Sequence, residues 1–240
     1  MFFILLSLIY SEKILFYNQL KIHRYQKDQI SKPVKTRTRF ANRNREEPEI
    51  PYWQDINAVA INKEKPRASF ISYDDTKTAL TYEFENSPYY INLNGKWKFY
   101  YVDYPKDLPP NITNADVDPS SWHDINVPGS WEPQGFAIAM YTNIKYDFNP
   151  KNPSPPKLPD YVPTGVYRRN MDIPESWLSR DIYLQIGGAK TGLYVYVNGI
   201  EVGYSEDSKN PADFLINDYV HSGSNIVTFK LYKHSSGSYL

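Results

Sequence analysis

A polar segment from Ser205 to Asp213 carries the side chains in this chain that are best suited to chemistry. It holds three carboxylates, one lysine and one asparagine: Glu206, Asp207, Asp213, Lys209 and Asn210. Carboxylates and amides are the groups that hydrogen-bond to hydroxyls, so we expect a site for a hydroxyl-rich ligand. Glu206 and Asp207 could be read as an acid/base pair. Adjacent residues on a strand point to opposite faces, however, so we do not expect this pair to be catalytic.

The residues just before this segment must position it, and they read as a hairpin. Strict alternation predicts a half-buried strand, with Leu193, Val195 and Val197 on one face and Tyr194, Tyr196 and Asn198 on the other. Asn198-Gly199 favours a type I′ turn. A return strand from Ile200 to Tyr204 then leads directly into the polar segment.

Further short alternating stretches predict more strands, and no convincing long helix interrupts them. The stretches are 96–102, 122–127, 165–173, 180–187 and 225–233. Short strands separated by turn signals are typical of an antiparallel sandwich, so we expect an all-β fold. The abundance of 22 tyrosines and 5 tryptophans fits either plain strand propensity or a surface on which rings stack against sugars.

Composition excludes several function classes. Lys and Arg number 27 and so do Asp and Glu, so no overall field favours nucleic acid or an anionic membrane as a partner. Cysteine is absent, which excludes disulfides and zinc-thiolate sites. The chain has no P-loop, no dinucleotide glycine fingerprint and no Gly-x-Ser-x-Gly elbow, and its four histidines show no metal-ligand spacing.

Residues 1–50 read as an N-terminal arm, partly helical or disordered, ahead of a domain at 51–240. The apolar run Phe2 to Tyr10 is too short to span a bilayer and lacks the basic start of a secretion signal. We expect a helical arm or an incorrect start site there, with a weak signal-like segment at 2–10 as the alternative. A helix is expected near Ile14 to Tyr25. The basic run Lys35 to Arg45 is read as a solvated segment, with an RNA-binding arm as the alternative.

An ordered series of motifs now carries a family resemblance over about residues 50–240. The motifs are LNGKWKF (93–99), VPGSWEPQGF (127–136), MYTNIKY (140–146), PTGVYRR (163–169), PESWL (174–178), VNGIEVGYSEDSKNPADF (197–214) and SGSYL (236–240). In this order and spacing they resemble the N-terminal sugar-binding domain of bacterial β-galactosidases of glycoside hydrolase family 2.

The resemblance implies a jelly-roll β-sandwich of the galactose-binding type, followed in the family by an immunoglobulin-like domain and a (β/α)₈ barrel. The barrel supplies the two glutamates of a retaining glycosidase, so we expect no catalytic residue within this chain and no turnover by the chain alone. The resemblance also implies sodium and magnesium in the full-length enzymes and a β-galactoside substrate. It further implies contact with the remaining domains and a homo-oligomer. A stand-alone lectin-like module that binds glycans without hydrolysis is the alternative.

The resemblance places two residues of this chain at the galactose site. Asn143, in the MYTNIKY motif, would hydrogen-bond to sugar hydroxyls, and Asp207, in the SEDSK stretch, would accept hydroxyl donors and help to hold a sodium ion. Asn143 could instead cap a turn, and Asp207 could be a solvated loop carboxylate or form an Asx-turn. The family pattern differs at Ala139-Met140, Asp147 and 235–237.

Overall fold

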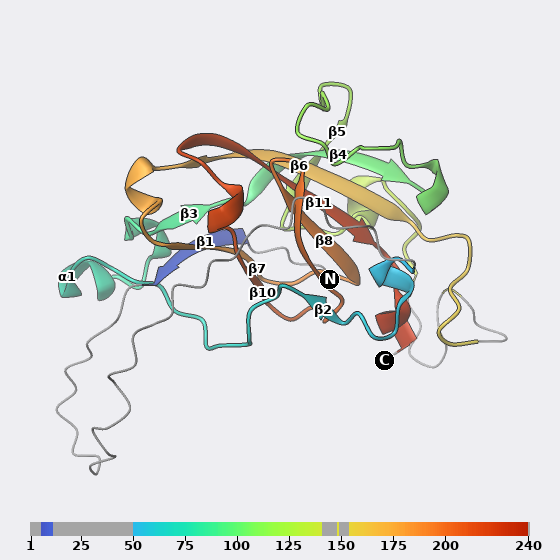
Figure 1. Cartoon of the computed structure of the whole chain (residues 1–240), viewed down its shortest axis with the longest axis horizontal. Helices are drawn as coiled ribbons and strands as arrows, with labels where there is room; N and C mark the ends of the chain where they lie inside the picture. Colours follow the sequence, from blue (N-terminus) through green and yellow to red (C-terminus); the bar gives the residue numbers. More distant parts are fainter. Residues whose placement is uncertain (1–5, 12–49, 141–147, 149–153, 240) are drawn as a thin grey trace, which may run out of the picture.

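The computed structural model describes residues 6–11, 50–140, 148 and 154–239, and strands dominate them (Figure 1). The single α-helix among the described residues is the short α1, Thr76–Ala79. The remaining helical turns are 3₁₀: Tyr52–Gln54, Phe84–Asn86, Pro105–Asp107, Glu132–Gln134, Glu175–Trp177, Asn217–Tyr219 and Ser236–Tyr239. The expected all-β class is therefore confirmed.

The larger sheet has seven antiparallel strands in the order β2-β9-β8-β11-β6-β4-β5. Their bounds are β2 Ala60–Ile61, β4 Gly95–Val102, β5 His123–Val127, β6 Thr164–Ile173, β8 Gly192–Val197, β9 Ile200–Ser205 and β11 Gly223–Tyr232. β11 lies at the centre, where Phe229 pairs with Tyr167 on one side and Val195 on the other. Long central strands pair fully, so they form the rigid frame of the domain.

The smaller sheet has four strands in the order β10-β7-β1-β3, also antiparallel. Their bounds are β1 Leu6–Ser11, β3 Tyr90–Asn92, β7 Asp181–Ile186 and β10 Ala212–Leu215. In Figure 1 the strands β1, β7 and β10 of this sheet are drawn below β4, β6 and β11 of the larger one. The chain crosses between the layers at the end of β9, and the polar segment makes that crossing.

The main core fills the space between the two sheets. It takes the inward-facing residues that alternation predicted: Trp97 and Phe99 from β4; Ile182, Leu184 and Ile186 from β7; Leu193, Val195 and Val197 from β8; Val227, Phe229 and Leu231 from β11. Phe99 is completely buried, and burial of a side chain of this kind contributes about 1.5–3 kcal/mol. Two packed layers around one core make the sandwich that the sequence predicts.

The expectation of a helical arm at residues 2–10 is wrong, because Leu6–Ser11 forms strand β1. β1 is hydrogen-bonded on both sides, with Leu8 opposite Leu184 of β7 and Ile91 of β3. β1 is therefore an inner strand of the smaller sheet, paired along both of its edges. The helix expected near 14–25 lies outside the described residues.

The expectation that β8 is half buried is also wrong, because every residue of Gly192–Val197 is buried. Tyr194 and Tyr196 face away from the main core into a second cluster, which includes Tyr52, Trp53 and Val162. Trp53 stacks on Tyr232 of β11 with ring centroids 4.6 Å apart. The segments that include Tyr52–Trp53 and Val162 thus cover the outer face of β8, and packing accounts for its two tyrosines.

Candidate functional site

The β8–β9 hairpin has the turn that its sequence predicts. Asn198 and Gly199 have φ values of 51° and 78°, both in the left-handed region that a type I′ turn requires. Asn198 also fixes the turn to β11. Its Oδ1 accepts from the backbone amide of Ile226 at 2.9 Å, and its backbone amide donates to the Ile226 carbonyl at 2.8 Å. The hairpin is therefore a rigid support for the polar loop at its other end.

Of the three carboxylates expected in that loop, Asp213 is buried in the fold. It belongs to β10 and is 7% exposed. Its Oδ1 accepts from Gln185 Nε2 at 2.9 Å, and its Oδ2 forms an ion pair with Arg67 Nε at 2.9 Å. Its charge is thus balanced within the fold, and the expectation that Asp213 is presented to a ligand is wrong.

Glu206 is buried as well, with 5% of its surface exposed. Its Oε1 accepts from Ser236 Oγ at 3.0 Å, and its Oε2 accepts from the Gly237 amide at 2.9 Å and from the Tyr204 hydroxyl at 3.2 Å. The carboxylate therefore binds the segment that follows β11. Glu206 and Asp207 both follow the end of β9 at Ser205, so strand alternation does not decide how their side chains are oriented.

Asp207 is the one carboxylate of this loop that reaches the surface, with 38% of its side chain exposed. Lys63 Nζ lies 2.9 Å from its Oδ2, and Asn210 Nδ2 donates to its Oδ1 at 2.7 Å. The hydrogen bond from Lys63, followed by that from Asn210, holds the pKa of Asp207 below its ordinary value of 3.8. Asp207 is therefore ionised at neutral pH.

An ionised carboxylate is a pure acceptor with about four lone-pair positions, of which these two contacts occupy one on each oxygen. Each oxygen can thus take a further donor from the solvent side. Lys63 is 7% exposed, so the cation that orients Asp207 is itself held by packing. The arrangement is a fixed, charged acceptor for hydroxyl groups.

Asn143, the second residue that the sequence places at the site, lies outside the described residues. Its proximity to Asp207 stays a prediction. The described residues on either side of this loop are both fixed to Lys233: its Nζ donates to the Ile138 carbonyl at 3.2 Å, and its amide donates to the Pro163 carbonyl at 2.9 Å.

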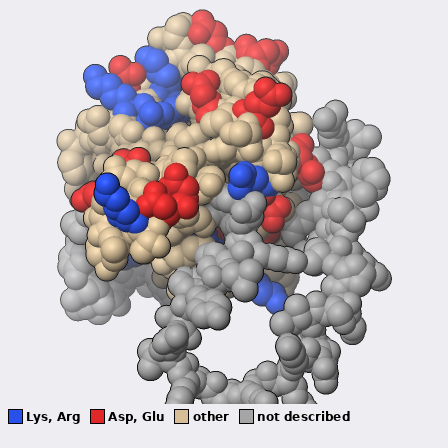
Figure 2. Space-filling view, turned by 90° about the vertical axis from the view of Figure 1, so that its left-hand side faces the viewer, with Lys and Arg blue, Asp and Glu red and all other residues tan. Residues whose placement is uncertain are grey.

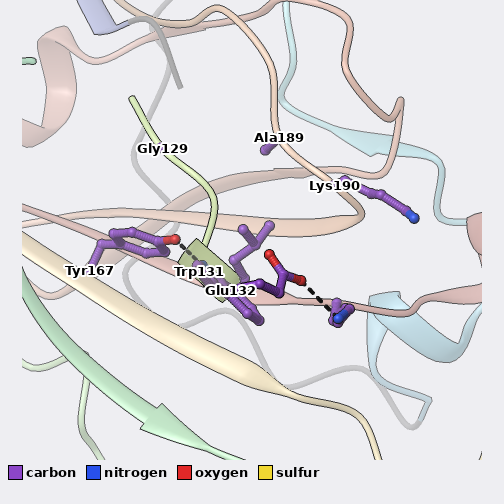
Figure 3. Close-up of a pocket in the computed structure, with 8 residues that line it drawn as sticks. Gly129, Trp131, Glu132, Tyr167, Ala189 and Lys190 are labelled. Carbon is purple, nitrogen blue, oxygen red and sulfur yellow. Dashed lines mark hydrogen bonds and ion pairs between the residues drawn. The ribbon is translucent and has the colours of Figure 1, made fainter. Parts of the chain in front are cut away.

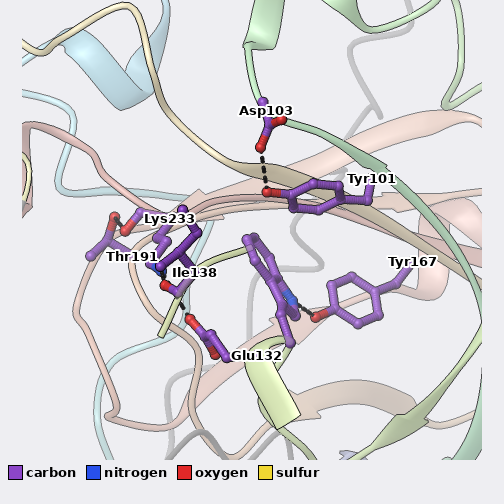
Figure 4. Close-up of polar contacts among 8 residues, drawn as sticks. Tyr101, Asp103, Glu132, Ile138, Tyr167, Thr191 and Lys233 are labelled. Atoms are coloured by element: carbon purple, nitrogen blue, oxygen red, sulfur yellow. Dashed lines mark hydrogen bonds and ion pairs between the residues drawn. The ribbon is translucent and has the colours of Figure 1, made fainter. Parts of the chain in front are cut away.

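Sequence reasoning missed the buried ion pair that Lys233 makes with Glu132, at 2.9 Å between Nζ and Oε1 (Figure 4). The two side chains are 7% and 13% exposed. They border a small hollow between the segments 129–132 and 189–190, which is also lined by Tyr167, Leu231 and Trp131 (Figure 3). Glu132 lies in the VPGSWEPQGF motif, but nothing in the local sequence indicates a partner 101 residues away.

A metal site must be judged from the donors that are present. The described residues contain no group of three or more His, Asp or Glu side chains that could hold an ion. The magnesium expected in the full-length enzymes stays a prediction. Asp207 fits as one oxygen ligand of a sodium ion, because its side chain is ionised and 38% exposed.

The face in Figure 2 carries side chains of both signs: basic atoms gather at its upper left, and acidic atoms are spread over its top, centre and right. The basic run Lys35 to Arg45 lies outside the described residues, so the RNA-binding alternative stays a hypothesis. Within the described part of the chain, no helix is long and apolar enough to cross a membrane.

Comparison with known proteins identifies the family of this chain. Residues 90–240 match the family described as "Glycosyl hydrolases family 2, sugar binding domain". The chain is 40% identical over 188 residues to a β-galactosidase of Psychromonas ingrahamii, covering 78% of this chain and 18% of the relative. It is 37% identical over 189 residues to a β-galactosidase of Actinobacillus pleuropneumoniae, covering 79% and 18%. The chain thus spans about a fifth of the length of these relatives.

Among solved structures, the chain is similar to a Bifidobacterium dentium β-glucuronidase complexed with coumarin-3-O-glucuronide. The TM-score is 0.43 and the identity 23%, covering 58% of this chain and 19% of that one. The match to the family extends over more than half of the chain and includes the hairpin, the Asp207 loop and the Glu132–Lys233 pair. The chain belongs to glycosyl hydrolase family 2 and contains its sugar-binding domain.

Proposed function

We propose that this chain is the sugar-binding part of a β-galactosidase that hydrolyses terminal β-D-galactosyl residues, as in lactose. The observation that carries the proposal is Asp207, an ionised and half-exposed acceptor that Lys63 and Asn210 hold in place. The β-galactosidases among its relatives support the choice of galactose.

In this proposal Asp207 accepts hydrogen bonds from galactosyl hydroxyls, and Asn143 adds an amide that both donates and accepts. Charge-assisted hydrogen bonds contribute about 1.5–3 kcal/mol each, so one carboxylate can account for a large part of the discrimination against other sugars. Asp207 would also supply one oxygen ligand to a sodium ion, whose charge would help to bind a hydroxyl. A buried acceptor left without its hydroxyl also disfavours deoxy analogues.

The bond itself would be broken outside the described sandwich, by two carboxylates of a (β/α)₈ barrel acting as acid/base and nucleophile. The immunoglobulin-like and barrel domains, and a second copy of the enzyme in a homo-oligomer, are therefore the proposed partners. The role of this domain is to position the sugar, which converts binding energy into orientation at the reacting centre.

The test is a chimaeric enzyme in which this whole chain replaces the matching part of the Psychromonas ingrahamii β-galactosidase. We expect the chimaera to hydrolyse a chromogenic β-galactoside. Asp207→Asn should lower kcat/KM about 10- to 100-fold, since it removes the charge from the acceptor. Asp172→Asn, which changes an exposed aspartate on β6, is the matched control and should leave kcat/KM unchanged.

Two results would contradict the proposal. A folded chimaera without turnover would mean that the domain does not serve a β-galactosidase, and equal activity of the Asp207→Asn and Asp172→Asn forms would remove Asp207 from the site. The lectin alternative predicts instead that the isolated chain binds galactose with a saturable heat signal that Asp207→Ala abolishes.

A further inference from the structure

Glu206 has a buried carboxylate for which the proposed function has no use. Within the described part of the chain no lysine or arginine forms an ion pair with it, although it is only 5% exposed. A buried carboxylate persists only when its oxygens are hydrogen-bonded, so its contacts must serve a purpose in the fold. Those contacts all lead to residues 204 and 236–237.

The chain approaches Glu206 closely at Gly237. A Cβ placed there would lie 3.1 Å from Glu206 Oε2 and 3.2 Å from its Cδ. A larger residue at 237 would therefore push the carboxylate away from the position in which it accepts from the 237 amide. Ser236 adds its hydroxyl, within 3.0 Å of Oε1 and 3.2 Å of Oε2. Two consecutive residues of the segment after β11 thus donate hydrogen bonds to this one carboxylate.

Glu206 also fixes the backbone immediately before Asp207. Its own amide donates to the Val59 carbonyl at 3.1 Å, four residues before Lys63 in the chain. Further along the loop, the Lys209 amide donates to the Ala189 carbonyl at 2.8 Å. The loop is held at Glu206 on one side and at Lys209 on the other, with Asp207 between them.

We propose that Glu206 is a positioning residue: its buried carboxylate anchors the loop to the segment after β11 and so keeps Asp207 beside Lys63 and Asn210. The anchoring itself follows from the fold. Its consequence for catalysis rests on the proposed function.

The anchoring is tested by amide hydrogen exchange on the isotope-labelled full chain. Glu206→Ala should speed exchange at the Lys209 and Asn210 amides at least about tenfold, because the loop opens locally, while amides in β4 and β6 keep their protection. Glu206→Gln retains an acceptor for the Gly237 amide, and the hydroxyls of Ser236 and Tyr204 can turn to accept from its NH₂ group. We expect exchange close to wild type for that variant.

Met171→Ala is the control for general destabilisation. Met171 is 2% exposed in the main core, on β6. Its truncation should lower the melting temperature without selective exchange at Lys209 and Asn210. Unchanged exchange at these two amides in Glu206→Ala, or equal acceleration in Glu206→Ala and Glu206→Gln, would overturn the proposal. If Glu206→Ala does not fold, Gly237→Ala takes its place, because its Cβ displaces the carboxylate without removing it.

The catalytic consequence is tested in the chimaera by a double-mutant cycle. If Glu206 acts through Asp207, Glu206→Ala should lower kcat/KM as Asp207→Asn does, and the double variant should be no worse than Asp207→Asn alone. Multiplied losses in the double variant would show that Glu206 acts independently. Local exchange in Glu206→Ala together with a fully active Asp207→Asn chimaera would refute the proposed function and leave the anchoring intact.

Discussion

Asp207 reaches the surface, whereas the two carboxylates near it in the sequence are buried and bind partners inside the fold. Glu206 points inward to Ser236 and Gly237, and Asp213 pairs with Arg67 and Gln185. The sequence could identify the polar segment and single out Asp207 through its family motif. It could not predict which carboxylates are buried, because these four partners lie at least 28 residues away in the chain.

The ion pair between Lys63 and Asp207 makes a prediction about acid stability. Because the pKa of Asp207 is lowered in the folded state, its contribution to stability is complete above about pH 3.8 and disappears as the pH falls through the lower folded value. Lys63→Met should therefore reduce the free energy of unfolding at pH 7 by no more than about 1 kcal/mol, because Asp207 is partly exposed and solvent screens the pair.

Urea unfolding at pH 7 and at pH 3 measures this difference. The gap between wild type and Lys63→Met should narrow at the lower pH, because Asp207 of the unfolded chain is then largely protonated. A gap of the same size at both pH values would mean that Lys63 stabilises the fold by packing alone, and that Asp207 is not held by charge.

At the scale of elements, the end of β11 connects the parts of the proposed site. Ser236 and Gly237 bind the Asp207 loop through Glu206, and Lys233 binds residues on both sides of the loop that includes Asn143. Alternation predicted β11 itself well. The residues that follow it carry no periodic signal, so their role became visible only when distant segments were brought together.

The buried pair of Lys233 and Glu132 makes a prediction at this scale. Removing one member leaves the other charge buried without a partner, which costs about 3–5 kcal/mol. Lys233→Met should therefore lower the free energy of unfolding by about that amount, while the double variant Lys233→Met/Glu132→Leu should recover most of the loss. Denaturant unfolding of the full chain measures both. A double variant as unstable as the single one would show that the pair is held in place by more than its mutual charge.

For the whole molecule, sequence patterns were sufficient for the class, the inward faces of β4, β7, β8 and β11, and the hairpin turn at Asn198-Gly199. They failed at β1 and on the outer face of β8. The alternating tyrosines of β8 have the pattern of a solvent-facing strand, and the segment that covers them begins at Tyr52, 142 residues earlier than Tyr194. Coverage from a distant segment leaves no trace in the local pattern, which explains the error at β8. The error at β1 is one of secondary structure, since a helix was expected where a strand forms.

The proposed function depends most on a direct hydrogen bond between Asp207 and a galactosyl hydroxyl. The most direct measurement is kcat/KM of the chimaera and of its Asp207→Asn form on galactosides that each lack one ring hydroxyl. We expect that the loss caused by Asp207→Asn, about tenfold or more on the parent galactoside, disappears on the analogue that lacks the bound hydroxyl and persists on the others. The same loss on every analogue would contradict it, since Asp207 would then bind no hydroxyl of the sugar.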